Sequence, residues 1–150
     1  MGKIKSWMKL FQPKLKKHHG NHWKKNFDYL MRKSTTLKAS LKKRSRDNNV
    51  SCDITVPQIR QMMLAVYGKK CNYCNVKILR TNMVCDHIIP ISHNGNSSIE
   101  NLQLICARCN TRKGPLTHIE YKKLMHWLNR QQSHIKDYIF RKLSKGDVYR

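Results

Sequence analysis

The hydrophobic residues of the first fifty positions recur at the spacing of one helix face. Near the start they repeat every three or four residues with lysines between them, at Ile4, Trp7, Met8, Phe11 and Leu15. This spacing predicts an amphipathic helix, and Pro13 predicts a kink or an end within it, because proline removes a backbone hydrogen bond. A second helix is predicted from about Trp23 to Leu41, where the same spacing returns.

The rest of the chain combines helix signals with shorter hydrophobic runs. Thr55 and Gln58 form a capping-box pattern that predicts a helix start, and Gly68 is suited to the left-handed turn that ends a helix. Two runs of β-type residues follow, at 76–79 and 83–91. Mixed patterns of this kind favour an α+β protein.

Three further helix starts lie in the C-terminal half. Ser97 predicts a short helical piece, and Thr117 with Glu120 forms a second capping box. Ser133 predicts the start of a last helix, so we expect C-terminal helices across 117–143.

Charge divides the chain into two parts. It holds 31 Lys+Arg and 8 Asp+Glu, a formal net charge of +23. Residues 1–50 carry 15 of the basic residues and 2 of the acidic ones, so we interpret them as a basic helical arm and 51–150 as the body. A chain this basic is expected to bind a polyanion, and nucleic acid is the leading candidate.

The hydrophobic content bounds the class of protein. Apolar residues make up 39% of the chain, enough for a modest core. The longest apolar run, 62–67, is far shorter than the roughly 20 residues that span a bilayer, and no signal-peptide pattern follows the basic start. We therefore expect neither a membrane protein nor a secreted one.

Four of the six cysteines form two C-x-x-C pairs: Cys71, Cys74, Cys106 and Cys109. Two such pairs suit a tetrahedral Zn²⁺, and four cysteine ligands leave no open position, so this zinc is expected to be structural. Buried free thiols or redox chemistry are the alternatives. Cys85 is interpreted as a small buried hydrophobe, and Cys52 has no partner pattern.

The residues between and after the cysteine pairs resemble a known family. They read Asp-His-Ile-Ile-Pro at 86–90, Asn-Leu-Gln-Leu-Ile-Cys at 101–106 and Cys-Asn-Thr-Arg-Lys-Gly at 109–114. In this order and spacing, 69–116 resembles the HNH endonucleases, specifically the zinc-stabilised, four-cysteine type with phage and homing-like members. The resemblance implies a ββα-metal HNH core with a four-cysteine zinc knuckle, here flanked by basic N-terminal and C-terminal helices.

The resemblance also implies roles for four residues. His87 corresponds to the general base, and Asp86 to a ligand of the catalytic metal. Asn101 corresponds to the residue that ties down the loop between the strands and so orients the histidine. Asn110 stands where the family name has its second histidine, and its carbonyl oxygen suits a hard cation such as Mg²⁺ or Mn²⁺. The implied reaction is phosphodiester hydrolysis to 5′-phosphate and 3′-hydroxyl ends.

Basic residues beside these motifs are candidates for phosphate contacts. They are Arg108, Arg112 and Lys113 near the second cysteine pair, and Lys42, Lys43, Arg44 and Arg46 at the end of the arm. A solvated basic face is the alternative interpretation. His93 is a weaker candidate for a metal ligand or phosphate contact.

Taken together, these patterns favour a metal-dependent endonuclease of double-stranded DNA. It is expected to be a homing-type enzyme of a phage or mobile element, in the cytoplasm of a bacterial host if phage-encoded. A double-strand break would need a homodimer or two successive nicks, because one site cuts one strand. Alternatives are a restriction-type endonuclease, a non-catalytic zinc-ribbon protein that binds nucleic acid, or an RNA-binding protein.

Overall fold

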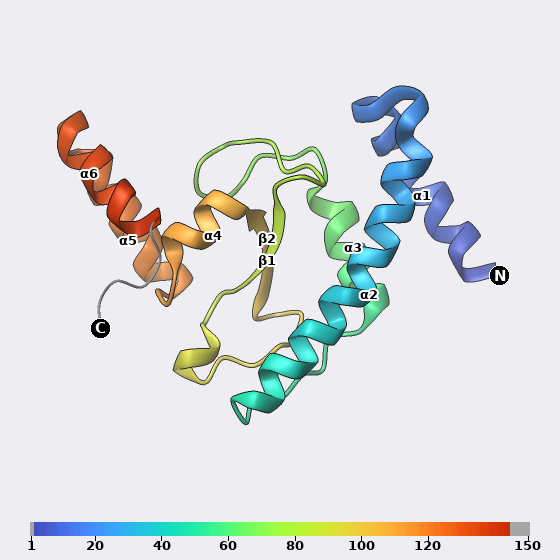
Figure 1. Cartoon of the computed structure of the whole chain (residues 1–150), viewed down its shortest axis with the longest axis horizontal. Helices are drawn as coiled ribbons and strands as arrows, with labels where there is room; N and C mark the ends of the chain where they lie inside the picture. The colour runs from blue at the N-terminus through green and yellow to red at the C-terminus, as the bar shows by residue number, and fades with distance from the viewer. Residues whose placement is uncertain (1, 145–150) are drawn as a thin grey trace.

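A computed structural model describes residues 2–144 of the chain. Within this range, three α-helices occupy the N-terminal part, and a two-stranded sheet with three further α-helices follows (Figure 1). In chain order the elements are α1 (Gly2–His19), η1 (Gly20–His22), α2 (Trp23–Asp47), α3 (Val56–Val66), β1 (Met83–His87), η2 (Ile91–His93), β2 (Leu102–Cys106), α4 (Ala107–Lys113), α5 (His118–Leu128) and α6 (Ser133–Ser144). Residue 1 and residues 145–150, the ends of the predicted arm and body, lie outside the described residues.

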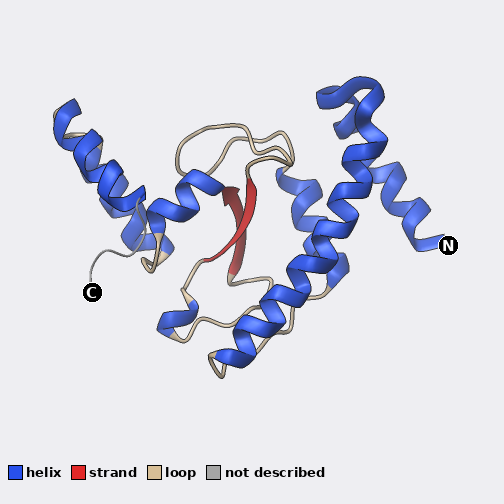
Figure 2. Ribbon diagram, viewed as in Figure 1, coloured by secondary structure: helices blue, strands red, loops and turns tan. Residues whose placement is uncertain are grey.

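The centre of the molecule is the hairpin of β1 and β2 followed directly by α4 (Figure 2). The strands pair antiparallel, with Met83 opposite Cys106 and His87 opposite Leu102. Helix α4 packs against both strands, and α3 packs against β2 and α2. The predicted α+β fold class with a ββα core is confirmed.

The basic N-terminal segment is helical, and its apolar face joins the same core as the hairpin. Phe11 of α1 and Phe27 of α2 meet edge to face with ring centroids 6.0 Å apart. The shared core also includes Leu15, Leu30, Leu41, Ile59, Met63, Tyr67, Met83, Leu104, Ile105 and Tyr121. Burial of this face, at roughly 25 cal/mol per Å² of apolar surface, attaches the segment to the rest of the fold.

Helix α1 continues through Pro13, so the expected end of the helix at this residue is wrong, while the expected kink stays a prediction. Phe11 and Leu15, on either side of the proline, are fully buried, while Pro13 itself faces solvent. Core packing on both sides therefore outweighs the roughly 3 kcal/mol that an interior proline costs a helix. Helix α2 also extends beyond its predicted end, so residues 42–46 lie on its last turns.

The predicted ends of α3 and the start of α5 are confirmed. Thr55 and Gln58 form the complete capping box, and Thr117 and Glu120 form the second one. Gly68 has a φ of +76°, and a Cβ there would overlap the imidazole of His18. These signals are reliable because each depends on atoms within a few residues of one another.

Three predictions for the middle of the chain are wrong. Residues 76–79 contribute only an isolated bridge, Lys70 with Lys77, in place of a strand. Strand β1 ends at His87 rather than at residue 91, because its partner β2 begins at Leu102. Ser97 starts no helix, since its side chain is buried in contacts described below.

Among the described residues, no helix is both long enough and apolar enough to cross a membrane.

Candidate functional site

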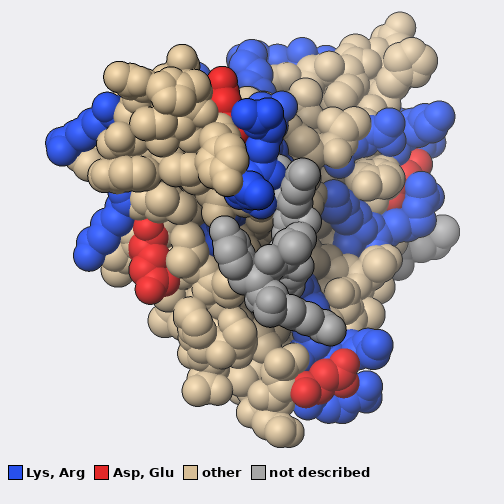
Figure 3. All heavy atoms as spheres, turned by 60° about the vertical axis from the view of Figure 1, so that its left-hand side comes forward, with Lys and Arg blue, Asp and Glu red and all other residues tan. Residues whose placement is uncertain are grey.

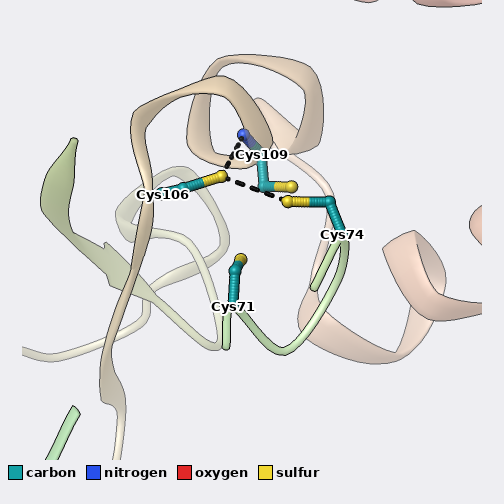
Figure 4. A group of neighbouring side chains, drawn as sticks. All are labelled: Cys71, Cys74, Cys106 and Cys109. Carbon is teal, nitrogen blue, oxygen red and sulfur yellow. Dashed lines mark hydrogen bonds between the residues drawn. The ribbon is translucent and has the colours of Figure 1, made fainter. Parts of the chain in front are cut away.

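The four cysteines of the two C-x-x-C pairs converge on one point (Figure 4). All four Sγ atoms lie within 4.8 Å of one another, and those of Cys74 and Cys106 are 3.5 Å apart. A tetrahedral zinc with Zn–S bonds of about 2.3 Å would separate its sulfurs by about 3.8 Å. Four thiols at this spacing, three of them buried, therefore fit a structural metal such as zinc.

The contact between Cys71 and Cys109 favours the thiolate form of Cys71 and the thiol form of Cys109. The hydrogen bond from Cys109 is the main cause that lowers the pKa of Cys71 to about 4. The same contact raises the pKa of Cys109, which keeps its proton. A bound cation would replace these shared protons, because cysteine binds metals as the thiolate. The cluster joins the loop before β1 to the junction of β2 with α4.

A cleft of about 400 Å³ opens beside the end of β1. It brings together Asp86 and His87 of β1, Asn110 of α4 and Arg44 of α2. Its remaining lining residues are Asn48, Cys85, Pro90, Ile91, Ser92 and Gly114. Three of the four residues for which catalytic roles were predicted thus share one cavity, together with a cation from the basic segment.

His87 is almost enclosed, with 6% of its surface exposed. Its Nε2 lies 2.9 Å from the Oγ of Ser97. Burial, followed by the positive charges of Arg44 and Lys113, lowers the pKa of His87 to about 4. The imidazole is therefore neutral around pH 7, which is the form that can accept a proton.

Both carboxylate oxygens of Asp86 have partners. Oδ1 accepts a hydrogen bond from the Nζ of Lys113 at 3.0 Å, and Oδ2 accepts one from the Nε2 of Gln103 at 2.8 Å. Gln103 also donates to the hydroxyl of Tyr73, which lies 2.6 Å from the Nδ1 of His118. This chain of contacts links Asp86 to the loop that carries the first cysteine pair, and it fixes the direction of the carboxylate.

Lys113 does not lie on the surface, where a phosphate contact was expected. Its side chain is fully buried, and its Nζ also donates to the backbone carbonyl of His87 at 2.8 Å. A buried ammonium needs a paired charge and hydrogen bonds, and Asp86 with this carbonyl provides them. The prediction that Lys113 clamps a flanking phosphate is corrected to a contact that positions Asp86 and the end of β1.

Asn101 lies just before β2 and bonds to the loop that follows β1. Its Oδ1 accepts from the backbone N–H of Ile89 at 2.8 Å. Its Nδ2 donates to the carbonyls of Ile89 at 3.0 Å and Asn96 at 2.7 Å. The side chain therefore closes the loop from both ends, and its effect on the orientation of His87 remains a prediction.

The other candidate phosphate contacts lie on two helices. Lys42, Lys43, Arg44 and Arg46 are exposed on α2, and Arg108 is exposed on α4. Arg112 places its guanidinium 4.0 Å from the ring centroid of Phe140 in α6. Basic side chains are spread over the face seen in Figure 3, with fewer acidic ones among them. His93 is exposed in η2 and does not line the cleft.

Sequence reasoning missed three residues of this site: Ser45, Ser97 and Gln103. The pattern around Ser97 was interpreted as a helix cap, because a serine before a polar segment is typical of one. Its contacts come from residues 10 and 52 positions away, and no local signal reports them.

Comparison with known proteins connects this geometry to one family. Residues 71–116 match a family model described as HNH endonuclease. The match contains both cysteine pairs, β1, β2 and α4, and it excludes α1, α2, α3, α5 and α6. A search of curated proteins found no match to the chain.

Proposed function

Since residues 71–116 match the HNH endonuclease family model, we propose that the protein is a metal-dependent endonuclease that cuts double-stranded DNA. The family implies a nuclease-type activity and binding to nucleic acid. The observation that supports catalysis is the shared cleft, which places Asp86, His87 and Asn110 beside Arg44. The basic N-terminal helices favour a homing-type role in a phage or mobile element, as proposed from the sequence.

The donor set of the cleft fits a hard divalent cation. Asp86 offers a carboxylate and Asn110 an amide oxygen, and Mg²⁺ and Mn²⁺ prefer such oxygen ligands. The partners of Asp86 leave further lone pairs on its oxygens. A bound Mg²⁺ or Mn²⁺ would supply Lewis-acid stabilisation of the negative charge on the phosphate and on the leaving oxygen.

His87 acts as the general base in this proposal. It takes a proton from a water molecule whose oxygen attacks phosphorus, and the bond from phosphorus to the 3′ oxygen breaks. The phosphate remains as the 5′-phosphate of one product strand. The 3′ oxygen of the other product strand takes a proton from solvent and becomes a hydroxyl. Asp86 and Asn110 line the cleft, and Asn101 holds the loop that follows β1.

Arg44 connects the cleft to the proposed DNA surface. It lines the cleft while Lys42, Lys43 and Arg46 are exposed on the same turns of α2. DNA lying along these turns would place one phosphate beside Asp86 and His87, with neighbouring phosphates against the other cations. One cleft cuts one strand, so a double-strand break requires two copies or two successive nicks.

The test is cleavage of supercoiled plasmid and of a random-sequence duplex library, with Mg²⁺ or Mn²⁺. His87→Ala should abolish cleavage and keep DNA binding. His126→Ala, on the exposed face of α5, is the matched control that should cleave normally. In a further control, a chelator removes Mg²⁺ and Mn²⁺. The protein must keep its zinc in this control, because removal of a structural metal would also abolish activity by unfolding.

Cleavage that survives in His87→Ala would contradict the assignment of the base. Intact plasmid and library with salt-sensitive binding would contradict the nuclease and favour the zinc-ribbon binding protein. Cleavage of RNA but not DNA would contradict the choice of substrate.

A further inference from the structure

Two buried serines lie behind His87, and neither has a part in the function proposed above. Ser45 is on α2 and Ser97 is in the loop before β2, with 1% and 0% of their surfaces exposed. The Oγ of Ser97 lies 2.8 Å from the Oγ of Ser45 and 2.9 Å from the Nε2 of His87. We call Ser45 and Ser97 the serine pair.

The backbone of Ser97 is held on both sides. Its N–H donates to the carbonyl of Ser51 at 2.9 Å, and its carbonyl accepts from the N–H groups of Asp53 and Ile54 at 3.2 and 3.1 Å. These bonds hold the backbone of Ser97 in place, and Ser45 and His87 are the partners of its buried hydroxyl. Such restraint is what a catalytic group requires from the residues behind it.

We propose that the serine pair positions His87: the Oγ of Ser97, held by Ser45, accepts a hydrogen bond from Nε2–H, which leaves the lone pair of Nδ1 directed at the cleft. This inference rests on the proposed function, because it names the nitrogen that acts as base. The Nε2–H donates to Ser97, and the hydroxyl of Ser97 donates to the Oγ of Ser45. A neutral imidazole has one donor and one acceptor nitrogen, so a fixed donor at Nε2 makes Nδ1 the acceptor.

The rest of the site agrees with this assignment. Within residues 2–144, nothing hydrogen-bonds to the Nδ1 of His87. In the same range, the buried side-chain atoms without a partner are the Oδ1 of Asn26 and the hydroxyl of Tyr121. Nδ1 is therefore not sealed in the protein, and His87 lines the cleft. In the other neutral tautomer, Nδ1 would carry the proton and Nε2 would accept from Ser97, so no lone pair of His87 would face the cleft.

The serine pair also makes the basic segment part of the catalytic site. Ser45 lies outside the matched family segment, between the exposed cations Arg44 and Arg46 on α2. The same turn of α2 thus exposes Arg44 and Arg46 to solvent and places the hydroxyl of Ser45 against Ser97. Without Ser45, the hydroxyl of Ser97 loses the acceptor that fixes its direction.

The experiment compares serine variants of the full-length protein for plasmid cleavage, DNA binding and the tautomer of His87. Ser97→Ala should lower the single-turnover rate constant by about ten- to a hundredfold, because a misplaced base loses its alignment. Ser45→Ala should lower it by about three- to tenfold, the effect of one hydrogen bond. Both variants should bind DNA and zinc as the wild type does. Ser97→Thr, which keeps the hydroxyl, should restore part of the rate.

Ser34→Ala is the matched control. Ser34 is also fully buried on α2, but its Oγ donates to the carbonyl of Met31 and accepts from the Nε of Arg60, and none of these residues lines the cleft. It should cleave at the wild-type rate. An equal loss of rate in Ser34→Ala and Ser45→Ala would overturn the inference, because it would reflect packing of α2 alone.

The tautomer separates this inference from the proposed function. In ¹⁵N-labelled protein at a pH where His87 is neutral, the imidazole nitrogen shifts should show the proton on Nε2, and Ser97→Ala should give a mixture. A wild-type proton on Nδ1 overturns the inference even if the protein cuts DNA. A fixed Nε2–H in a protein that cuts no nucleic acid would instead contradict the proposed function and leave the positioning role in place.

Discussion

Asn101→Ala is the substitution whose cost the structure defines most directly. The change removes three hydrogen bonds, one accepted and two donated, which join the residue before β2 to Ile89 and Asn96. Each typical hydrogen bond contributes about 1 kcal/mol net, and Ile89 is 48% exposed, so water can replace part of what is lost. We expect the free energy of unfolding to fall by about 2–3 kcal/mol.

Asn101→Asp should cost at least as much. Its second carboxylate oxygen would face the carbonyls of Ile89 and Asn96, which accept hydrogen bonds and cannot donate them. Asn110→Ala is the contrast: among the described residues its side chain makes no hydrogen bond, and it lies in helix α4. It should change the free energy of unfolding by no more than about 0.5 kcal/mol.

The assay is urea unfolding followed by tryptophan fluorescence with zinc in excess, combined with amide hydrogen exchange. The amide of Ile89 should lose its protection in Asn101→Ala, while amides of the β1–β2 ladder keep theirs. Near-wild-type stability of Asn101→Asp would refute the reasoning, because the loop would not depend on the two donated hydrogen bonds. Unchanged protection of the Ile89 amide would refute it as well.

Three further predictions concern pH, salt and zinc. The pKa of His87 is about 4 in the folded protein and near 6.5 when unfolded. The unfolded chain therefore binds the proton more readily, and at most about 3 kcal/mol of stability should be lost as pH falls from about 6.5 to 4. His87→Gln should flatten this dependence in urea titrations, and an unchanged slope would contradict it. Removing the four cations at the end of α2 should lower the slope of log Kd for DNA against log salt concentration by up to about 3.6. Lys42→Arg, which keeps the charge, should leave the slope unchanged. These cations are Lys42, Lys43, Arg44 and Arg46. Cys106→Ser should lose zinc and the cooperative unfolding of α4, whereas Cys52→Ser should retain both by metal analysis and circular dichroism. A wild-type protein without metal would contradict the zinc cluster.

Local signals accounted for the parts of the site that depend on short stretches of chain. The capping boxes at Thr55 and Thr117 were correct because the donor and acceptor are three residues apart. The two C-x-x-C pairs converged as predicted, since each pair already presents two sulfurs on one turn. The order of the motifs then led to the family, which the match to residues 71–116 supports.

Errors arose where distant packing overrides a local tendency. Pro13 does not end α1, because buried residues on both sides hold the helix in the core. Lys113 was predicted to meet phosphate because lysine is usually exposed, but Asp86 makes its burial tolerable. Ser97 was interpreted as a cap, whereas its hydroxyl is part of the serine pair.

The sequence by itself determined the chemical character of this protein: its charge, its four clustered thiols and the carboxylate, imidazole and amide groups of the candidate site. These follow from composition and from short motifs, whose geometry the chain sets over a few residues. Only the tertiary structure decided that Arg44 lines the cleft and that Ser45 supports His87 through Ser97. The physical reason is that α2 contacts residues that lie far from it in the sequence, 52 positions away for Ser45 and Ser97, and the shared core of α1, α2, α3 and the hairpin brings these segments together.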